Sequence, residues 1–133
     1  MGNLIEELKE EHVYIMTELQ KAKRLNLYSP EAKEILFNLK TFFLNHLKKE
    51  DELLYPKLIE AGKKDRSIKK IVDTFASDME DFSKRANTFF DTFNQKSTGY
   101  EYSSELGYLL GYLKDRHWKE ETILFKKYDE KIG

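Results

Sequence analysis

The 133-residue chain has no cysteine, only two prolines and six glycines. Without cysteine, neither a disulfide framework nor a thiolate metal site can form, so any metal must be held by nitrogen and oxygen ligands. No run of about 18 apolar residues occurs, and we therefore expect no membrane span. Residues Met1–Glu6 lack the basic stretch and apolar run of a signal peptide, which leads us to expect a cytoplasmic location.

An excess of charge of either sign is also missing. The chain carries 23 Lys and Arg residues against 24 Asp and Glu residues, a formal net charge of -1. This balance argues against a protein that works mainly by binding nucleic acid or an anionic membrane. The sequence contains no glycine-rich phosphate loop and no nucleophilic cysteine, so nothing in it supports a kinase or a hydrolase.

The apolar residues of the chain follow a helical period. Alternating strand patterns are missing, and apolar residues recur at spacings of three and four along four long segments. The expected helices run from Asn3 to about Asn26, from Ser29 to Gly62 with an interruption at Pro56, from about Ser67 to Gln95, and from about Ser103 to Tyr128. Short connections between such helices predict an all-α, antiparallel up-down four-helix bundle, with residues 1–133 forming a single domain. In the last helix, Gly107 and Gly111 predict the close approach of a neighbouring helix.

Polar residues of metal-ligating types interrupt the apolar faces of all four helices. Two histidines are followed four residues later by a glutamate, as His46–Glu50 and His117–Glu121. Residues i and i+4 lie on one face of a helix, so each pair directs an imidazole and a carboxylate to the same place. The candidate metal ligands are His12, His46, Glu50, Asp78, His117 and Glu121.

These six side chains are expected to meet. At ~1.5 Å of rise per residue, they all lie in one layer roughly 10 to 22 Å from the same end of the bundle. Buried carboxylates without partners are strongly disfavoured and repel one another. A dinuclear metal centre, bridged by two glutamates, would remove that cost. The simpler alternative is a metal-free helical interaction module in which the histidines are ordinary core residues.

Three motifs follow one another in a fixed order along the chain. They are Glu11-His12, His46–Glu50 followed by Leu54-Tyr55-Pro56, and His117–Glu121. In this order and spacing, and over essentially its whole length, the chain resembles the hemerythrin family, specifically the hemerythrin-like HHE cation-binding domains. The resemblance implies a four-helix bundle that holds a non-haem di-iron centre with carboxylate and oxygen bridges. It also implies that His12 and His46 ligate one iron ion, that His117 ligates the other, and that Glu50 and Glu121 bridge them.

Two departures from the oxygen-carrying hemerythrins bear on function. The carriers have His-x-x-x-His on the third helix, whereas no histidine occurs between positions 47 and 116 here. Asp78 is the best candidate on that helix, ahead of Asp81 and Thr74. The carriers also end in His-x-x-x-x-Asp, a position that Thr122 occupies in this chain. With fewer nitrogen donors and a shifted redox potential, sensing, iron handling or peroxide chemistry is favoured over reversible oxygen carriage.

The sequence therefore predicts a protein with two non-haem iron ions, for which other divalent metals are alternatives. It would bind or sense dioxygen or a related small diatomic or peroxide ligand, or handle iron. A binding role is favoured over catalysis, and we assign no catalytic residue. An oxidative or peroxidatic di-iron enzyme is a further alternative. We expect no nucleic-acid or membrane partner, and the sequence indicates no particular protein partner.

Overall fold

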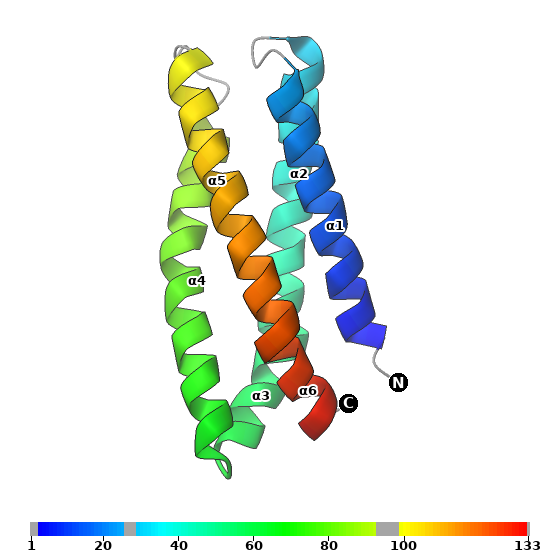
Figure 1. The fold of residues 1–133 in the computed structure, drawn as a ribbon, viewed down its shortest axis with the longest axis vertical. Helices are drawn as coiled ribbons and strands as arrows, with labels where there is room; N and C mark the ends of the chain where they lie inside the picture. The colour runs from blue at the N-terminus through cyan, green and yellow to red at the C-terminus, as the bar shows by residue number, and fades with distance from the viewer. Residues whose placement is uncertain (1–2, 26–28, 93–98, 133) are drawn as a thin grey trace.

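The computed structural model of the chain describes residues 3–25, 29–92 and 99–132. Within these ranges it contains helices and turns and no strand. The long helices are α1 (Asn3–Arg24), α2 (Pro30–Lys49), α4 (Arg66–Thr92) and α5 (Gly99–Lys119). Two of them continue past a π-helical turn, α2 through η1 (Glu50–Leu54) into α3 (Tyr55–Gly62), and α5 through η2 (Glu120–Leu124) into α6 (Phe125–Lys131). The predicted all-α four-helix bundle is confirmed (Figure 1).

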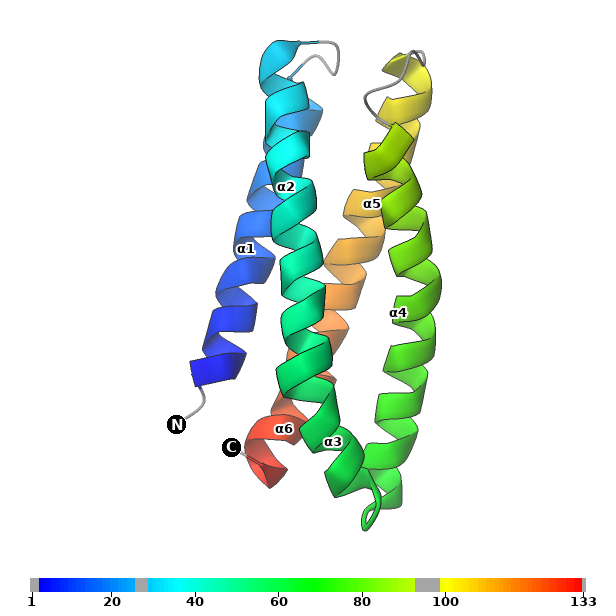
Figure 2. The same cartoon turned by 180° about the vertical axis from the view of Figure 1, so that it is seen from behind.

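The four long helices form an elongated bundle. The beginning of α1, the α3–α4 corner and α6 lie at one end, and the end of α1 and the beginning of α2 lie at the other (Figures 1 and 2). Helix α1 packs against both α2 and α5, whereas α4 makes most of its contacts with α3. Helices α4 and α5 touch each other sparsely, and this spacing leaves room for the cleft described below.

Local sequence signals explain several helix boundaries. The Ser29 hydroxyl accepts a hydrogen bond from the Ala32 backbone N–H at 3.2 Å, and Pro30 opens α2, as the sequence predicts. The interruption predicted at Pro56 is present as the turn η1, which ends just before α3. Helix α4 ends at Thr92, and the predicted end at Gln95 lies outside the described residues, as does Asn26.

The prediction that a neighbouring helix approaches closely at Gly107 and Gly111 is wrong. A methyl group placed on either glycine would have no described atom within 4 Å outside its own helical turn, so no neighbouring helix approaches them closely. The close approach occurs instead at Gly62, where the added carbon would lie 3.2 Å from the Lys69 backbone. Gly62 thus allows α3 and α4 to meet tightly at their corner.

A buried polar layer divides the apolar core into two parts. One part holds residues such as Leu19, Phe43 and Leu113, and the other holds residues such as Leu8 and Leu124. The layer between them contains His12, His46, Glu50, Arg116, His117 and Glu120. Burial of apolar side chains on both sides stabilises the bundle by roughly 25 cal/mol per Å², and it forces the polar layer to find partners away from water.

Among the helices that the structure describes, none combines the length and the apolar character needed to cross a membrane.

Candidate metal centre

The three histidines of the chain meet in the middle of the bundle although they come from three different helices. His12 lies on α1, His46 on α2 and His117 on α5, and all three are buried. The rings of His12 and His117 stack with centroids 3.7 Å apart and planes 2° apart. The ring of His46 lies edge-on to His12 at a centroid distance of 5.0 Å. Three imidazoles therefore gather around one point.

Two carboxylates complete this cluster, and each begins a π-helical turn. Glu50 is the first residue of η1 and Glu120 is the first residue of η2, and each is only 1% exposed. Glu50 Oε1 lies 3.6 Å from His46 Nε2, and Glu120 Oε1 lies 3.1 Å from His12 Nε2. Such single π turns inside α-helices are frequent at functional sites.

The side chains form two overlapping groups that could hold a metal ion. One consists of His12, His117 and Glu120, and the other of His12, His46 and Glu50, with ligand atoms within 4.8 Å of one another in each group. Two buried atoms of the cluster, His117 Nδ1 and Glu50 Oε2, have no hydrogen-bond partner in the described part of the chain, and His12 Nε2 faces Glu120 Oε1 at 3.1 Å. An unpartnered buried polar atom costs about 1–3 kcal/mol. Imidazole and carboxylate lone pairs are ligands for iron, zinc and manganese, so the residues fit a metal ion.

Outer carboxylates orient two of the imidazoles. His46 Nδ1 donates a hydrogen bond to Glu11 Oε1 at 2.6 Å, and Lys49 holds the other oxygen of Glu11. His12 Nδ1 donates to Glu121 Oε2 at 2.9 Å. With its proton on Nδ1, each ring would have an Nε2 lone pair that can ligate a metal ion. Histidine–carboxylate pairs of this kind fix the tautomer and the orientation of metal-ligating imidazoles.

Burial sets the protonation of the histidines. It lowers the pKa of His117 to about 2, with further contributions from His12, His46 and Arg116. Burial also lowers the pKa of His46, although its hydrogen bond to Glu11 acts in the opposite direction. Both imidazoles are therefore neutral at physiological pH, which is the form that binds metals.

The pKa values of the two buried glutamates shift in opposite directions. Burial and the neighbouring charge of Glu120 raise the pKa of Glu50 well above its usual value. Burial disfavours the ionised form of Glu120 as well, but the nearby His12 nitrogen and the Arg116 charge outweigh it and lower the pKa of Glu120. Without metal, the cluster therefore favours a protonated Glu50 beside an ionised Glu120.

Arg116 is a member of the cluster that sequence reasoning missed. It is buried, and its Nε donates to Glu120 Oε2 at 3.2 Å. Its Nη2 donates to the Phe75 carbonyl at 3.0 Å and to the Tyr55 hydroxyl oxygen at 3.2 Å. The available signal was its position four residues before Glu120, the spacing of a helical ion pair.

The structure brings four of the six predicted ligands together and leaves two outside. His12, His46, Glu50 and His117 lie in the cluster. Glu121 is 34% exposed and holds the outer nitrogen of His12, while Glu120 takes the inward position. Residues i+3 and i+4 both lie near residue i on a helix, so spacing from His117 could not separate these two glutamates.

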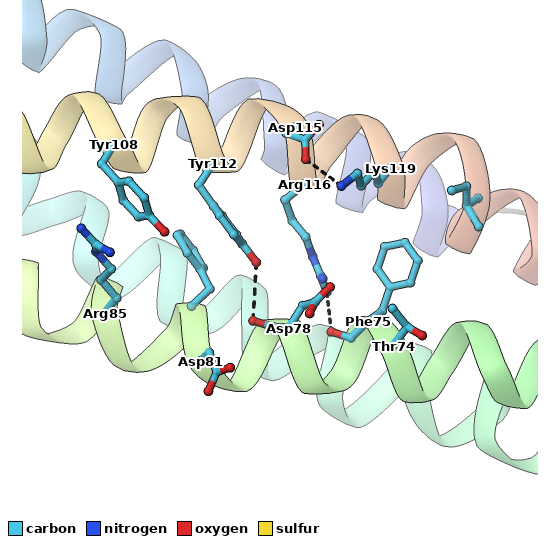
Figure 3. Close-up of a pocket in the computed structure, with 12 residues that line it drawn as sticks. Thr74, Phe75, Asp78, Asp81, Arg85, Tyr108, Tyr112, Asp115, Arg116 and Lys119 are labelled. Carbon is cyan, nitrogen blue, oxygen red and sulfur yellow. Dashed lines mark hydrogen bonds and ion pairs between the residues drawn. The ribbon is translucent and has the colours of Figure 1, made fainter.

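Asp78 is the other predicted ligand outside the cluster. It is exposed on α4 and lines a cleft of about 690 Å³ between α4 and α5. The two other α4 candidates, Asp81 and Thr74, line the same cleft (Figure 3). Ligand roles for Asp78 and Glu121 stay predictions, and the geometry favours Glu120.

Histidines and glutamates that converge at mid-height in a helical bundle are the arrangement in which such bundles build metal sites. The chain matches the family model of the hemerythrin HHE cation binding domain over residues 3–128. It therefore belongs to that family, whose domains bind metal cations. No curated protein and no solved structure matches the chain.

Proposed function

We propose that this protein binds iron in the cluster and uses it to bind or sense dioxygen or a related small ligand. The observation that carries the proposal is a set of buried ligand atoms: His117 Nδ1 and Glu50 Oε2 have no hydrogen-bond partner among the described residues, and His12 Nε2 faces the Glu120 carboxylate at 3.1 Å. In a metal-free interaction module these atoms would gain nothing from being buried, whereas a bound cation compensates all three at once.

The donor set favours a borderline metal with redox chemistry. The cluster offers three imidazoles and two carboxylates and no sulfur, a mixed nitrogen and oxygen set that suits iron. Iron, when bound, supplies accessible oxidation states and coordination positions that the protein leaves open. The chain's own residues hold it, keep the imidazoles neutral and exclude bulk water from the layer.

The cleft between α4 and α5 supports the approach of a small ligand. Its lining includes Phe75 and Tyr112 together with Arg116 (Figure 3). Arg116 also contacts Glu120 of the cluster. A ligand that enters the cleft thus lies one side chain away from the carboxylate layer. This places a guanidinium, a hydrogen-bond donor, on the path between solvent and the metal ligands.

Metal retention and thermal stability test iron binding. Protein loaded anaerobically with ferrous iron and desalted should retain iron in the wild type and in the exposed control Asp78→Asn, and lose it in His46→Ala. A ligand at a hundred times its dissociation constant stabilises the folded state by about 2.7 kcal/mol. We therefore expect the midpoint of thermal unfolding to rise by roughly 10 °C on iron loading in the wild type and in Asp78→Asn. Loss of iron from the wild type with no change in midpoint would favour the metal-free interaction module.

The absorption spectrum tests the small-ligand role. Admitting air to the ferrous protein should produce new absorption bands, and the zinc-loaded protein should show none because zinc has no redox chemistry. An unchanged spectrum in the iron protein, with iron still bound, would refute the role in binding or sensing dioxygen and leave iron handling.

A further inference from the structure

Arg116 occupies the side of the cluster that faces α4. Its guanidinium bridges Glu120 on η2, the Phe75 carbonyl on α4 and the Tyr55 hydroxyl on α3. It also lies over the Phe75 ring, with Cζ 4.7 Å from the ring centroid. A fixed positive charge with this many partners cannot leave without stranding several buried groups.

Helix α4 brings no ligand to the metal groups. All side chains in these groups come from α1, α2, α5 and the π turns η1 and η2, as far as the described residues show. Where α4 passes the cluster, it presents the ring and carbonyl of Phe75 to Arg116. The acids of α4 nearest to Phe75 in sequence, Asp73 and Asp78, are exposed, as is Asp81. A second ion on the α4 side would lack protein ligands there.

The two π turns reveal which ligand position Arg116 fills. Each turn begins with a buried glutamate and ends with a buried leucine, Leu54 in η1 and Leu124 in η2. Four residues before the first glutamate stands His46, with Nε2 3.6 Å from Glu50. Four residues before the second stands Arg116, with Nε 3.2 Å from Glu120. The guanidinium thus takes the place at η2 that an imidazole takes at η1.

His12 can serve only one metal ion. His12 belongs to both candidate groups, and its Nδ1 is already bonded to Glu121, so only its Nε2 can ligate. A neutral imidazole nitrogen has one lone pair and binds one metal ion. Because His12 can serve only one ion, the two groups cannot each hold an ion with a full set of ligands, and one ion between them would draw on His46 and Glu50 from one group and on His117 and Glu120 from the other.

Charge balance leads to the same number. The cluster buries two glutamates and one arginine. One divalent ion together with Arg116 exceeds the charge of the glutamates by a single unit, whereas a second divalent ion would raise the excess to three units. Uncompensated charge in a layer shielded from water is strongly disfavoured.

We propose that this chain holds a single metal ion, bound by His12, His46, His117, Glu50 and Glu120, and that the Arg116 guanidinium stands in place of a second ion. The proposal rests on metal binding at the cluster, as proposed above. It departs from the two-ion centre that the sequence predicts, because the positive charge on the α4 side comes from the protein itself.

Counting ions separates these alternatives. The wild-type protein, metal-free and then titrated with Zn²⁺ in a calorimeter, should bind one ion per chain, with elemental analysis after desalting as a check. Loaded with Mn²⁺, it should give the electron paramagnetic resonance spectrum of an isolated ion. Two ions per chain with a spin-coupled manganese signal would overturn the single-ion proposal while leaving metal binding intact. No bound ion would refute metal binding itself.

Two substitutions test the part played by Arg116. Arg116→Gln removes the charge, keeps hydrogen-bonding capacity and frees a Glu120 oxygen, so a second and weaker Zn²⁺ should bind at high metal concentration. Arg116→Lys keeps the charge and should stay at one ion. A ratio of one ion in both variants, with helical content matching the wild type by circular dichroism, would refute the assignment of Arg116 as the second cation. The wild-type count remains decisive should Arg116→Gln fail to fold.

Discussion

His12 and His117 lie with their imidazole rings parallel, 3.7 Å apart between centroids. Two protonated imidazoles could not share this geometry in a buried layer, because like charges at such a distance repel strongly in a low dielectric. The stack therefore commits at least one ring to the neutral form. Burial, together with His12, His46 and Arg116, makes His117 that ring by lowering its pKa to about 2.

Acid should destabilise the metal-free protein through His117. The pKa of His117 is about 2 in the folded chain and has the ordinary value of 6.5 in the unfolded chain. Between pH 2 and pH 6.5, His117 is therefore protonated in the unfolded chain and neutral in the folded chain. The contribution of His117 is complete above pH 6.5 and is lost as the pH falls. Below pH 5.5, the free energy of unfolding should drop by about 1.4 kcal/mol per pH unit from this residue, measured by urea denaturation after chelation.

The control for this prediction is His117→Gln, which cannot take up the proton. Its free energy of unfolding should fall less steeply with acid than that of the wild type. Contributions from other groups, including the depressed pKa of His46, are largely common to both proteins and cancel in the difference. Equal slopes in the two proteins would show that His117 titrates normally in the folded state.

Glu50 should act in the opposite direction. Its folded pKa is raised by burial and by Glu120, so the folded chain keeps a proton that the unfolded chain has lost. This contribution is complete below pH 4.5 and disappears as the pH rises through the folded pKa. Metal-free Glu50→Gln should thus gain stability relative to the wild type as the pH rises from 5 to 8, while its Zn²⁺ affinity falls by a hundredfold or so. A constant difference in the free energy of unfolding across this range would contradict the raised pKa.

The adjacent residues Glu120 and Glu121 form a matched pair for testing the ligand set. Glu120→Gln removes an inward carboxylate and should weaken Zn²⁺ binding by more than a hundredfold in a competition titration with a chromophoric chelator. Glu121→Gln removes only the hydrogen-bond partner of His12 Nδ1, and outer partners of this kind are worth about ten- to a hundredfold. The reverse order of effects would support the sequence-based assignment of Glu121 as the ligand.

Replacing a glycine by alanine should change the free energy of unfolding in opposite directions at Gly111 and at Gly62. Gly111→Ala should raise the free energy of unfolding by about 0.5–1 kcal/mol, because no described atom crowds the added methyl group and alanine favours the helix. Gly62→Ala should lower it by about 1 kcal/mol, because its methyl group would meet the Lys69 backbone at 3.2 Å. Chemical denaturation of the two variants measures both values, and a stabilised Gly62→Ala would show that the α3–α4 corner adjusts freely.

Helical periodicity predicted much of this molecule. The four helices, the cap at Ser29 and the interior positions of His12, His46 and Glu50 follow from spacing, because burial on a helix repeats every three or four residues. Spacing could not choose between Glu120 and Glu121, since both neighbour the preceding helical turn. The sequence pattern did not single out Arg116, because a buried arginine is recognised mainly through its partners.

Those partners come from distant parts of the chain. Tyr55 and the Phe75 carbonyl, which hold the Arg116 guanidinium, lie 61 and 41 residues away. No local pattern records such contacts, which exist only once the helices have packed. Asp78 lies outside the cluster for a complementary reason: a matching depth along the bundle does not fix the direction in which a side chain points.

The polar layer gives the bundle two apolar cores in series, joined at a belt of charged and imidazole groups. When α2 is counted with its continuation α3, and α5 with its continuation α6, all four helices contribute to both cores. A cation bound in the belt would link α1, α2 and α5 to one another at mid-height. Metal binding would then slow amide hydrogen exchange even in helices that do not contact the ion.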